Sequence, residues 1–140
     1  MRELLRHAAD LGVTVHIAHL PDGYLGGWYP EEQRIYLGIG LTPCETRCVL
    51  AHELGHVYYG HNCDDNRAET QADVYAARLL IDPAAYARAE RLTSTDVDLA
   101  EELGVTLDVL HTYRARCLTR LRGVSYVRPR HGAGQWSYRA

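Results

Sequence analysis

The spacing of apolar residues in the N-terminal part of the chain changes from a helical period to a strand period. Apolar residues recur every three to four positions over 2–10, which predicts a short amphipathic helix. They alternate with other residues over 13–17, which predicts a strand. Residues 24–29 and 34–37 are predicted to pair as a hairpin. Gly26-Gly27 in the first arm indicates a bulge or a close approach by another backbone.

Capping residues mark where the following helices begin and end. Thr42 can act as an N-cap, Pro43 suits the first helical position, and Glu45 completes a capping box. This helix is expected to run to about Tyr59 and to end at Gly60. Further helices are predicted over residues 67–81, 84–91, 96–103 and 107–121, and a strand or arm with frayed ends over 123–140.

These elements predict an α+β fold, with a small N-terminal antiparallel sheet, a long central helix and further helices behind it. A length of 140 residues suits one compact domain that buries its own core. We expect a core over residues 1–93 and a helical extension over 94–122 packed on this core. Residues 123–140 are expected to form a basic C-terminal arm.

Charge is divided unevenly between the two parts of the chain. All 18 acidic residues lie at or before Asp108, together with 8 arginines, which gives this part a net charge of −10. Residues 109–140 carry 7 arginines and no acid, a net charge of +7. Such a division is typical of an acidic body with a basic arm.

Composition excludes several classes of protein. A hydrophobic share of 46% is that of a globular chain and not of a disordered one. No apolar run approaches the ~20 residues that span a bilayer, and charges interrupt the N-terminus, so we expect neither a membrane span nor a signal peptide. The expected location is the cytoplasm. There, the cysteines are free thiols or metal ligands rather than a disulfide framework; they are Cys44, Cys48, Cys63 and Cys117.

A candidate metal site lies in the helix that begins at residue 43. This helix contains the sequence HELGH at positions 52–56. Histidines four positions apart lie on one helix face, so His52 and His56 can bind a single Zn²⁺ at ~2.0–2.1 Å. Glu53 lies beside such a metal. It can take a proton from an activated water and pass this proton to a leaving amine.

A catalytic zinc ion needs a third protein ligand and one open coordination position. The next helix offers Glu69 and Asp73, which again lie four positions apart on one face. Glu69 can bind the zinc ion, while Asp73 accepts the second N–H of a ligand histidine and so fixes its tautomer. The opposite side of this helix is apolar and is expected to face the core.

The two helices resemble those of the ImmA/IrrE family of metallopeptidases. The matching segments are VLAHELGHVYYGH at 49–61 and ETQADVYAARLL at 69–80. The chain departs from the family pattern at Tyr75, where Phe is more common, and at residues 81–83, where Ile-Asp-Pro replaces the usual Met-Pro. Neither departure affects a candidate ligand.

This resemblance implies a zincin-like fold and a zinc-dependent endopeptidase. The family motif assigns Glu53 as the catalytic group and, as zinc ligands, His52, His56 and Glu69. Family members are cytoplasmic peptidases, often carried by phages or mobile elements, and those characterised cleave a helix-turn-helix repressor. We therefore expect a protein substrate of the repressor type and no membrane partner.

Two other interpretations of the metal-binding residues remain open. The zinc site can be retained for structure alone, in a non-catalytic regulator that binds DNA or a protein partner. A separate structural zinc site can also form from Cys44, Cys48, His61 and Cys63. However, Cys44 and Cys48 lack a partner knuckle, and lone cysteines more often fill small apolar spaces. His61 is expected to be a loop residue or to contact a ligand, rather than to bind zinc.

Residues 99–106 look like the first helix and turn of a helix-turn-helix unit. The second helix begins at Leu107-Asp108, and Asp108 would repel a DNA phosphate, so we favour a helix pair that closes over the core. The basic arm carries interleaved aromatic residues, which can bind nucleic acid. Packing of the arm on the acidic body is the simpler interpretation, and nucleic acid is not the expected partner.

Overall fold

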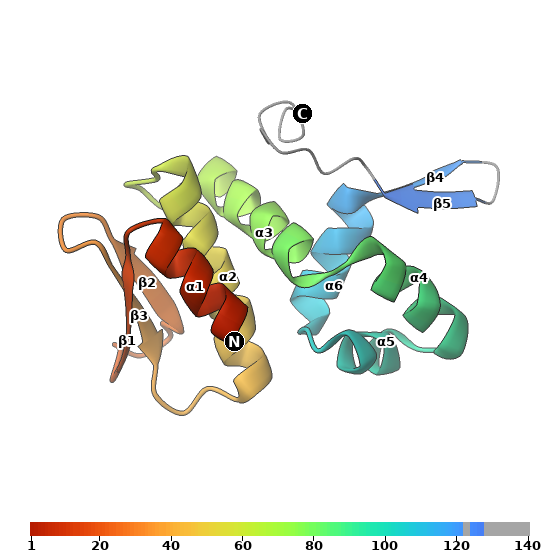
Figure 1. Cartoon of the computed structure of the whole chain (residues 1–140), viewed down its shortest axis with the longest axis horizontal. Coiled ribbons are helices and arrows are strands. Elements are labelled where there is room, and N and C mark those ends of the chain that lie inside the picture. The colour runs from red at the N-terminus through yellow and green to blue at the C-terminus, as the bar shows by residue number, and fades with distance from the viewer. Residues whose placement is uncertain (122–123, 128–140) are drawn as a thin grey trace.

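The computed structural model of the chain describes residues 1–121 and 124–127. Within these ranges the order is α1 (Arg2–Asp10), β1 (Thr14–Ala18), β2 (Gly26–Tyr29), β3 (Arg34–Gly38), α2 (Pro43–Tyr59), α3 (Asn66–Leu80), α4 (Pro83–Leu92), α5 (Asp96–Leu103), α6 (Leu107–Thr112), a π-helical turn (Tyr113–Cys117), β4 (Leu118–Leu121) and β5 (Val124–Val127). Figure 1 shows the three-stranded sheet at one end, α2 and α3 in the middle and α4–α6 at the other end. The predicted α+β class is confirmed.

The N-terminal sheet is mixed, so the prediction of an antiparallel sheet is wrong for one of its two pairings. The strand order is β1-β3-β2, in which β2 pairs with β3 antiparallel, as the predicted hairpin requires. β1 pairs with β3 in parallel. Because β3 returns from the hairpin turn and enters between β1 and β2, it runs in the same direction as β1. Alternation of apolar residues defines a strand but does not identify its neighbours.

One face of this sheet packs on α2. The side chains of Ile35 and Leu37 in β3 are fully buried against Leu50 and Leu54 of α2, and α1 covers the same cluster from the side. Gly26 of β2 lies so close to α2 that a Cβ atom built on it would be 2.5 Å from Cγ1 of Val49. Gly26 is thus a place of close approach, as the glycine pair suggested, but the nearest atom belongs to the Val49 side chain and not to another backbone.

The ends of α2 agree with the capping signals. The Thr42 side chain accepts a hydrogen bond from the Glu45 N–H at 3.1 Å, and the Glu45 carboxylate accepts one from the Thr42 N–H at 3.2 Å. Pro43 occupies the first helical position. Gly60 ends the helix in the left-handed conformation, with φ 67°, which glycine adopts without a steric cost. These caps fix the first and last residues of α2.

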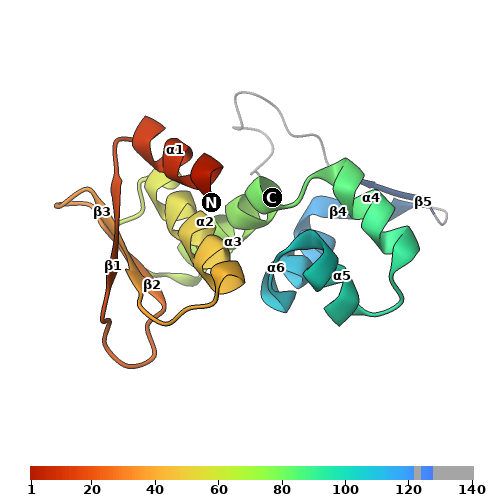
Figure 2. The same cartoon turned by 60° about the horizontal axis from the view of Figure 1, so that its bottom comes forward.

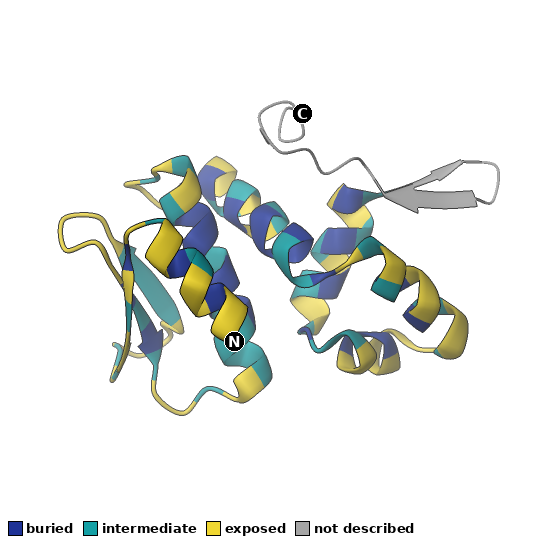
Figure 3. Cartoon of the chain, in the orientation of Figure 1, coloured by how far each residue is buried: buried dark blue, intermediate teal, exposed yellow. Residues whose placement is uncertain are grey.

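Helices α2 and α3 approach each other closely. A Cβ atom added to Gly55 would lie 2.8 Å from Cα of Ala72, so only glycine fits at this contact. Ala72 is itself fully buried, as are most residues on the facing sides of the two helices (Figure 3). Two small residues thus bring the polar residues of both helices within hydrogen-bonding distance.

The remaining helices enclose a second apolar cluster. Leu99 of α5 and Leu110 of α6 pack there with Tyr86 of α4, and with Cys48 and Ala77 from α2 and α3. Figure 2, turned from the first view, keeps α4–α6 on the far side of α3 from the sheet. The cluster extends across the boundary predicted at residue 93. The division into core, extension and arm stays a prediction.

Helix α6 is shorter than predicted. It ends at Thr112, followed by the π-helical turn, and β4 then pairs with β5 in an antiparallel hairpin. The prediction of a helix to Leu121 is therefore wrong, because the last four residues of that span use their backbone groups in strand pairing. Of the predicted basic arm, 124–127 form a strand, and 128–140 lie outside the described residues. In the described part of the chain, no helix combines the length and apolar character that crossing a membrane requires.

Candidate metal centre

Three side chains from α2 and α3 meet at one point. Nε2 of His52 and Nε2 of His56 lie 3.1 Å apart. The carboxylate of Glu69 lies 3.1 Å from each of them, with one oxygen towards His52 and the other towards His56. Ligand atoms of the three residues all lie within 4.8 Å of one another. The helical spacing predicted from the sequence thus brings two imidazoles and one carboxylate together.

Asp73 lies one turn further along α3 and contacts the outer side of His52. Its carboxylate accepts a hydrogen bond from Nδ1–H of His52 at 2.8 Å. With the proton on Nδ1, the Nε2 lone pair of His52 is directed towards His56 and Glu69. This is the arrangement expected for Asp73 from the sequence, and it orients the imidazole for metal binding.

His56 has a different partner on its outer side. Its Nδ1 lies 2.9 Å from Nδ1 of His61, and Nε2 of His61 lies 2.8 Å from Oε1 of Gln71. His61 therefore contacts a candidate ligand and does not join the group of three. His61 lies in the loop between α2 and α3 and also contacts a candidate ligand, so both descriptions expected from the sequence apply to it.

The surroundings of the two histidines shift their pKa values in opposite directions. Burial lowers the pKa of His56, and the neighbouring His52 lowers it further, which favours the neutral imidazole that binds metals. Burial also disfavours protonation of His52, but the hydrogen bond to Asp73 and the nearby carboxylates outweigh it and raise its pKa. A bound divalent cation would compete with the proton at Nε2 of His52.

Glu53 lies beside the group of three without being part of it. Its side chain is 8% exposed, and burial raises the pKa of its carboxyl to about 7, with the charges of Glu69 and Asp64 acting in the same direction and His52 opposing. A carboxyl group with a pKa near neutrality can both accept and donate a proton under ordinary conditions. This position is compatible with the role of general base that the sequence predicts for Glu53.

The chemistry of this donor set fits zinc. The Nδ1 atoms of His52 and His56 are engaged by outer partners, so both Nε2 atoms face the Glu69 carboxylate. When both histidines are neutral, their lone pairs and the negative charge of Glu69 repel one another, and a cation bound between them removes this repulsion. Two histidines and one glutamate are a common ligand set of catalytic zinc sites.

Two hollows meet at these residues. One, of about 640 Å³, extends towards the C-terminal end of α2 and includes apolar residues of β2 and the loop before it. The other, of about 770 Å³, extends along the N-terminal half of α2 to α6. Both are lined by Tyr24, Gly26, His52 and Glu53. All three residues of the candidate metal centre thus line the first hollow, and His52 and Glu53 line both.

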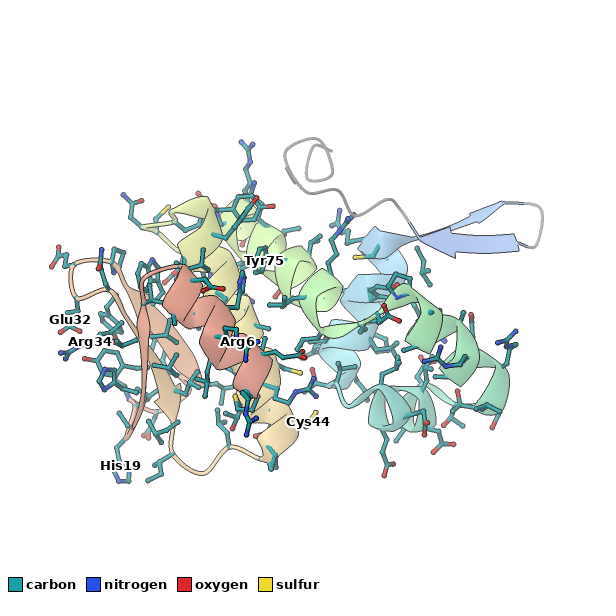
Figure 4. All side chains as sticks on the ribbon, in the orientation of Figure 1. Arg6, His19, Glu32, Arg34, Cys44 and Tyr75 are labelled. Atoms are coloured by element: carbon teal, nitrogen blue, oxygen red, sulfur yellow. The ribbon has the colours of Figure 1, made fainter. Side chains whose placement is uncertain are left out.

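The cysteines do not assemble a second site. Cys48 is buried in the apolar cluster of α4–α6, and Cys44 lies at the start of α2 against the same cluster (Figure 4). Cys63 is exposed and contacts the Asp65 carboxylate. Across residues 1–121 and 124–127, His52, His56 and Glu69 are the one group of three or more side chains with metal-binding geometry. The alternative of a cysteine-rich zinc site therefore has no support.

Sequence reasoning missed two residues that shape the centre. Gly55 lies inside the HELGH motif and has no predicted role, although a glycine inside a helix costs about 1 kcal/mol relative to alanine and so indicates a packing reason. Gln71 carried no signal, because its contact with His61 depends on how the loop after α2 returns to α3.

Comparison with known proteins identifies the fold and the family of the chain. In fold, the chain is similar to a Mycobacterium tuberculosis transcriptional regulator of known structure, with a TM-score of 0.64 and 19% sequence identity. The similarity covers 87% of this chain and 42% of the regulator, so the chain spans less than half of the regulator's length. No curated protein matches the sequence. The family model of peptidase M78, the IrrE N-terminal-like domain, matches residues 8–113. The chain therefore belongs to the peptidase M78 family, and its α+β architecture is the zincin-like fold of the IrrE N-terminal domain.

Proposed function

We propose that the chain is a zinc-dependent endopeptidase that cleaves a regulatory protein. The observation that carries the proposal is the convergence of His52, His56 and Glu69 next to the buried carboxyl of Glu53. A metal ligand set alone would serve structure equally well. The buried carboxyl beside the ligand set, whose pKa burial raises to about 7, is in addition suited to act as a general base in hydrolysis.

His52, His56 and Glu69 would hold the zinc ion, which, when bound, acidifies water and polarises a peptide carbonyl. Glu53 accepts the proton of the attacking water on its carboxylate. It then returns this proton to the nitrogen of the scissile bond, which leaves as an amine. Burial of Glu53 supports both steps, because a carboxyl group of raised pKa is a stronger base and is readily reprotonated.

The shape of the cleft supports cleavage within a chain rather than at its end. Hollows on both sides of His52 and Glu53 provide room for substrate residues before and after the scissile bond. β2 is an edge strand of the sheet and lines the first of these hollows. An extended substrate can pair with the free edge of β2 and so pass across the metal centre.

A regulatory protein as substrate is supported by the family and by the structural neighbour, which is described as a transcriptional regulator. We propose a repressor-type protein, cleaved in the cytoplasm. A reducing compartment suits Cys44, Cys48 and Cys63, which are free thiols.

The second candidate is a non-catalytic regulator that retains the metal for structure. The name of the structural neighbour favours it, and α5–α6 is the segment that resembles a helix-turn-helix. Leu99 and Leu110 of this segment are buried in the apolar cluster, and Asp108 is exposed at the start of α6. An exposed acid at that position disfavours contact with DNA phosphates.

The substitution Glu53→Gln separates the two candidates. Glutamine has the size of glutamate and cannot act as a base, so the variant is expected to bind zinc as the wild type does and to lose cleavage. The assay incubates each zinc-loaded protein with a proteome-derived peptide library and identifies new termini by mass spectrometry. Equal cleavage by both proteins would contradict the proposed mechanism. No cleavage by the wild type, with salt-dependent binding to duplex DNA that His52→Ala leaves unchanged, would favour the regulator.

A further inference from the structure

The two candidate ligand histidines are supported by different chemical groups. His52 donates its Nδ1–H to the carboxylate of Asp73, an arrangement common at metal sites. His56 instead faces another imidazole, because its Nδ1 lies against Nδ1 of His61. A histidine is an ambiguous partner, because each of its nitrogens can be a donor or an acceptor. A further contact must therefore determine which ring nitrogen of His61 carries the proton.

Gln71 determines the tautomer of His61. Its carbonyl oxygen Oε1 lies 2.8 Å from Nε2 of His61 and can only accept a hydrogen bond, so His61 carries its proton on Nε2. Nδ1 of His61 then has a lone pair, and the group at 2.9 Å from it must be a donor. That group is Nδ1 of His56. The proton of His56 is thereby held on Nδ1, and its Nε2 lone pair is left for the metal.

Local backbone structure brings His61 into this position. The left-handed Gly60 turns the chain back at the end of α2, and the N–H of His61 donates to the carbonyl of His56 at 2.9 Å. The His61 ring then stacks on Tyr59, with ring centroids 5.5 Å apart and an interplanar angle of 15°, and meets the His56 ring edge-on. The orientation of His61 is thus determined by packing on one side and by Gln71 on the other.

We propose that His61 and Gln71 are positioning residues that hold His56 in the tautomer that presents Nε2 to the metal. This inference rests on the proposed metal centre but not on peptide cleavage. Helix α3 would then orient both ligand histidines, in addition to carrying the ligand Glu69. Asp73 orients His52 directly, and Gln71, two residues earlier on the same helix, orients His56 through His61.

The test compares variants that keep or remove the acceptor at position 71. Methionine in Gln71→Met has a similar size and no comparable acceptor. Glutamate in Gln71→Glu keeps an acceptor oxygen at the same place, now as part of a carboxylate. His61→Phe removes the connection while keeping a flat ring against Tyr59. Thr70→Ala changes the exposed neighbour on α3 and serves as the matched control. Circular dichroism and thermal unfolding establish that each variant is folded before zinc is added.

The first readout is zinc affinity, measured by competition with a chelator. His61→Phe is expected to bind zinc ~10–100-fold more weakly, the usual cost of losing a partner of a ligand histidine. Gln71→Met should show a loss in the same direction, of up to about tenfold. Gln71→Glu and Thr70→Ala should stay within about twofold of wild type. Zinc affinity of folded His61→Phe within twofold of wild type would overturn the proposal.

The second readout is the tautomer itself, from the imidazole ¹⁵N resonances of the zinc-loaded protein. His56 is expected with its proton on Nδ1, and His61 with its proton on Nε2. A proton on Nδ1 of His61 in the wild type would overturn the proposal. Neither readout needs a substrate. A protein that shows both tautomers but cleaves no peptide therefore supports this inference while contradicting the proposed function.

Discussion

The α2–α3 pair and the α4–α6 region use their polar residues differently. Between α2 and α3, small residues at Gly55 and Ala72 allow close approach, and the polar side chains of the two helices meet each other. In α4–α6, large residues such as Tyr86 and Tyr113 fill the space between the helices. Several polar residues there cap helix ends, as Asp82, Thr95 and Thr106 do.

This difference indicates what each region contributes. Close contact between two rigid helices limits the freedom of the side chains they carry, which is what a site with defined geometry needs. An apolar cluster filled by large side chains contributes mainly stability. Substitutions in the two regions should therefore separate metal affinity from the free energy of unfolding.

The largest expected effect on stability comes from Leu110→Ala. Leu110 is fully buried in the α4–α6 cluster, so its truncation removes apolar contacts and leaves a cavity, at a cost of about 2–5 kcal/mol. Chemical denaturation measures this loss. The zinc affinity of the folded variant should equal that of the wild type. A variant with normal stability but weaker zinc binding would reverse the roles assigned to the two regions.

The next largest effect is expected from Gly55→Ala, which should change both the free energy of unfolding and the zinc affinity. Alanine favours a helix by about 1 kcal/mol over glycine, but its Cβ would lie 2.8 Å from the backbone of Ala72. Separating α2 from α3 to relieve this contact is expected to cost about 1–3 kcal/mol, so that stability falls overall. Glu69 and Asp73 move with α3, and zinc affinity should fall as well. Increased stability with unchanged zinc affinity would show that the close contact is unnecessary.

A smaller effect is expected from removing a helix cap in each region. Thr42→Ala and Thr106→Ala each delete a hydroxyl that accepts a backbone N–H, at 3.1 Å from Glu45 and 3.4 Å from Val109. Each should cost about 1 kcal/mol. Thr42→Ala should cost more, because it also breaks a capping box. Paired thermal unfolding curves measure the difference, and a larger loss for Thr106→Ala would contradict this order.

The smallest effect concerns pH and the exposed Asp96. A hydrogen bond from Arg114 holds the pKa of the Asp96 carboxyl below its usual value, with help from His111. Because the pKa is lower in the folded state than in the unfolded state, this contact stabilises the fold above the unfolded value of about 4. The contribution is lost as pH falls through the folded value. Asp96→Asn should lower the free energy of unfolding slightly at pH 7. The variant should also lose less of this free energy than the wild type does when the pH falls below about 4. The same dependence in both proteins would exclude the contact as its source.

Local signals account for the parts of the molecule that could be predicted from sequence. The ends of α2 follow from Thr42, Pro43 and Gly60, whose backbone preferences act within one turn. The grouping of His52, His56 and Glu69 follows from helical spacing and from the short connection between two helices. Such features depend on a few neighbouring residues and on little else.

The parts that could not be predicted depend on contacts between distant segments. β1 pairs in parallel because β3 enters between the other two strands, which no alternation of residues specifies. The helix from residue 107 ends early because Leu118–Leu121 pairs with another strand. Gln71 reaches His61 only after Gly60 has turned the chain back. In each case, local sequence preferences allow more than one structure, and contacts between distant segments select the one that forms.

The most direct test of the metal centre is the zinc content of the purified protein, measured by elemental analysis after dialysis against zinc-free buffer. We predict about one zinc ion per wild-type chain, and loss of this zinc from folded His56→Ala and Glu69→Ala, with Thr70→Ala as the control that keeps it. A wild-type chain that retains no zinc, or folded His56→Ala and Glu69→Ala variants that retain it fully, would contradict the account.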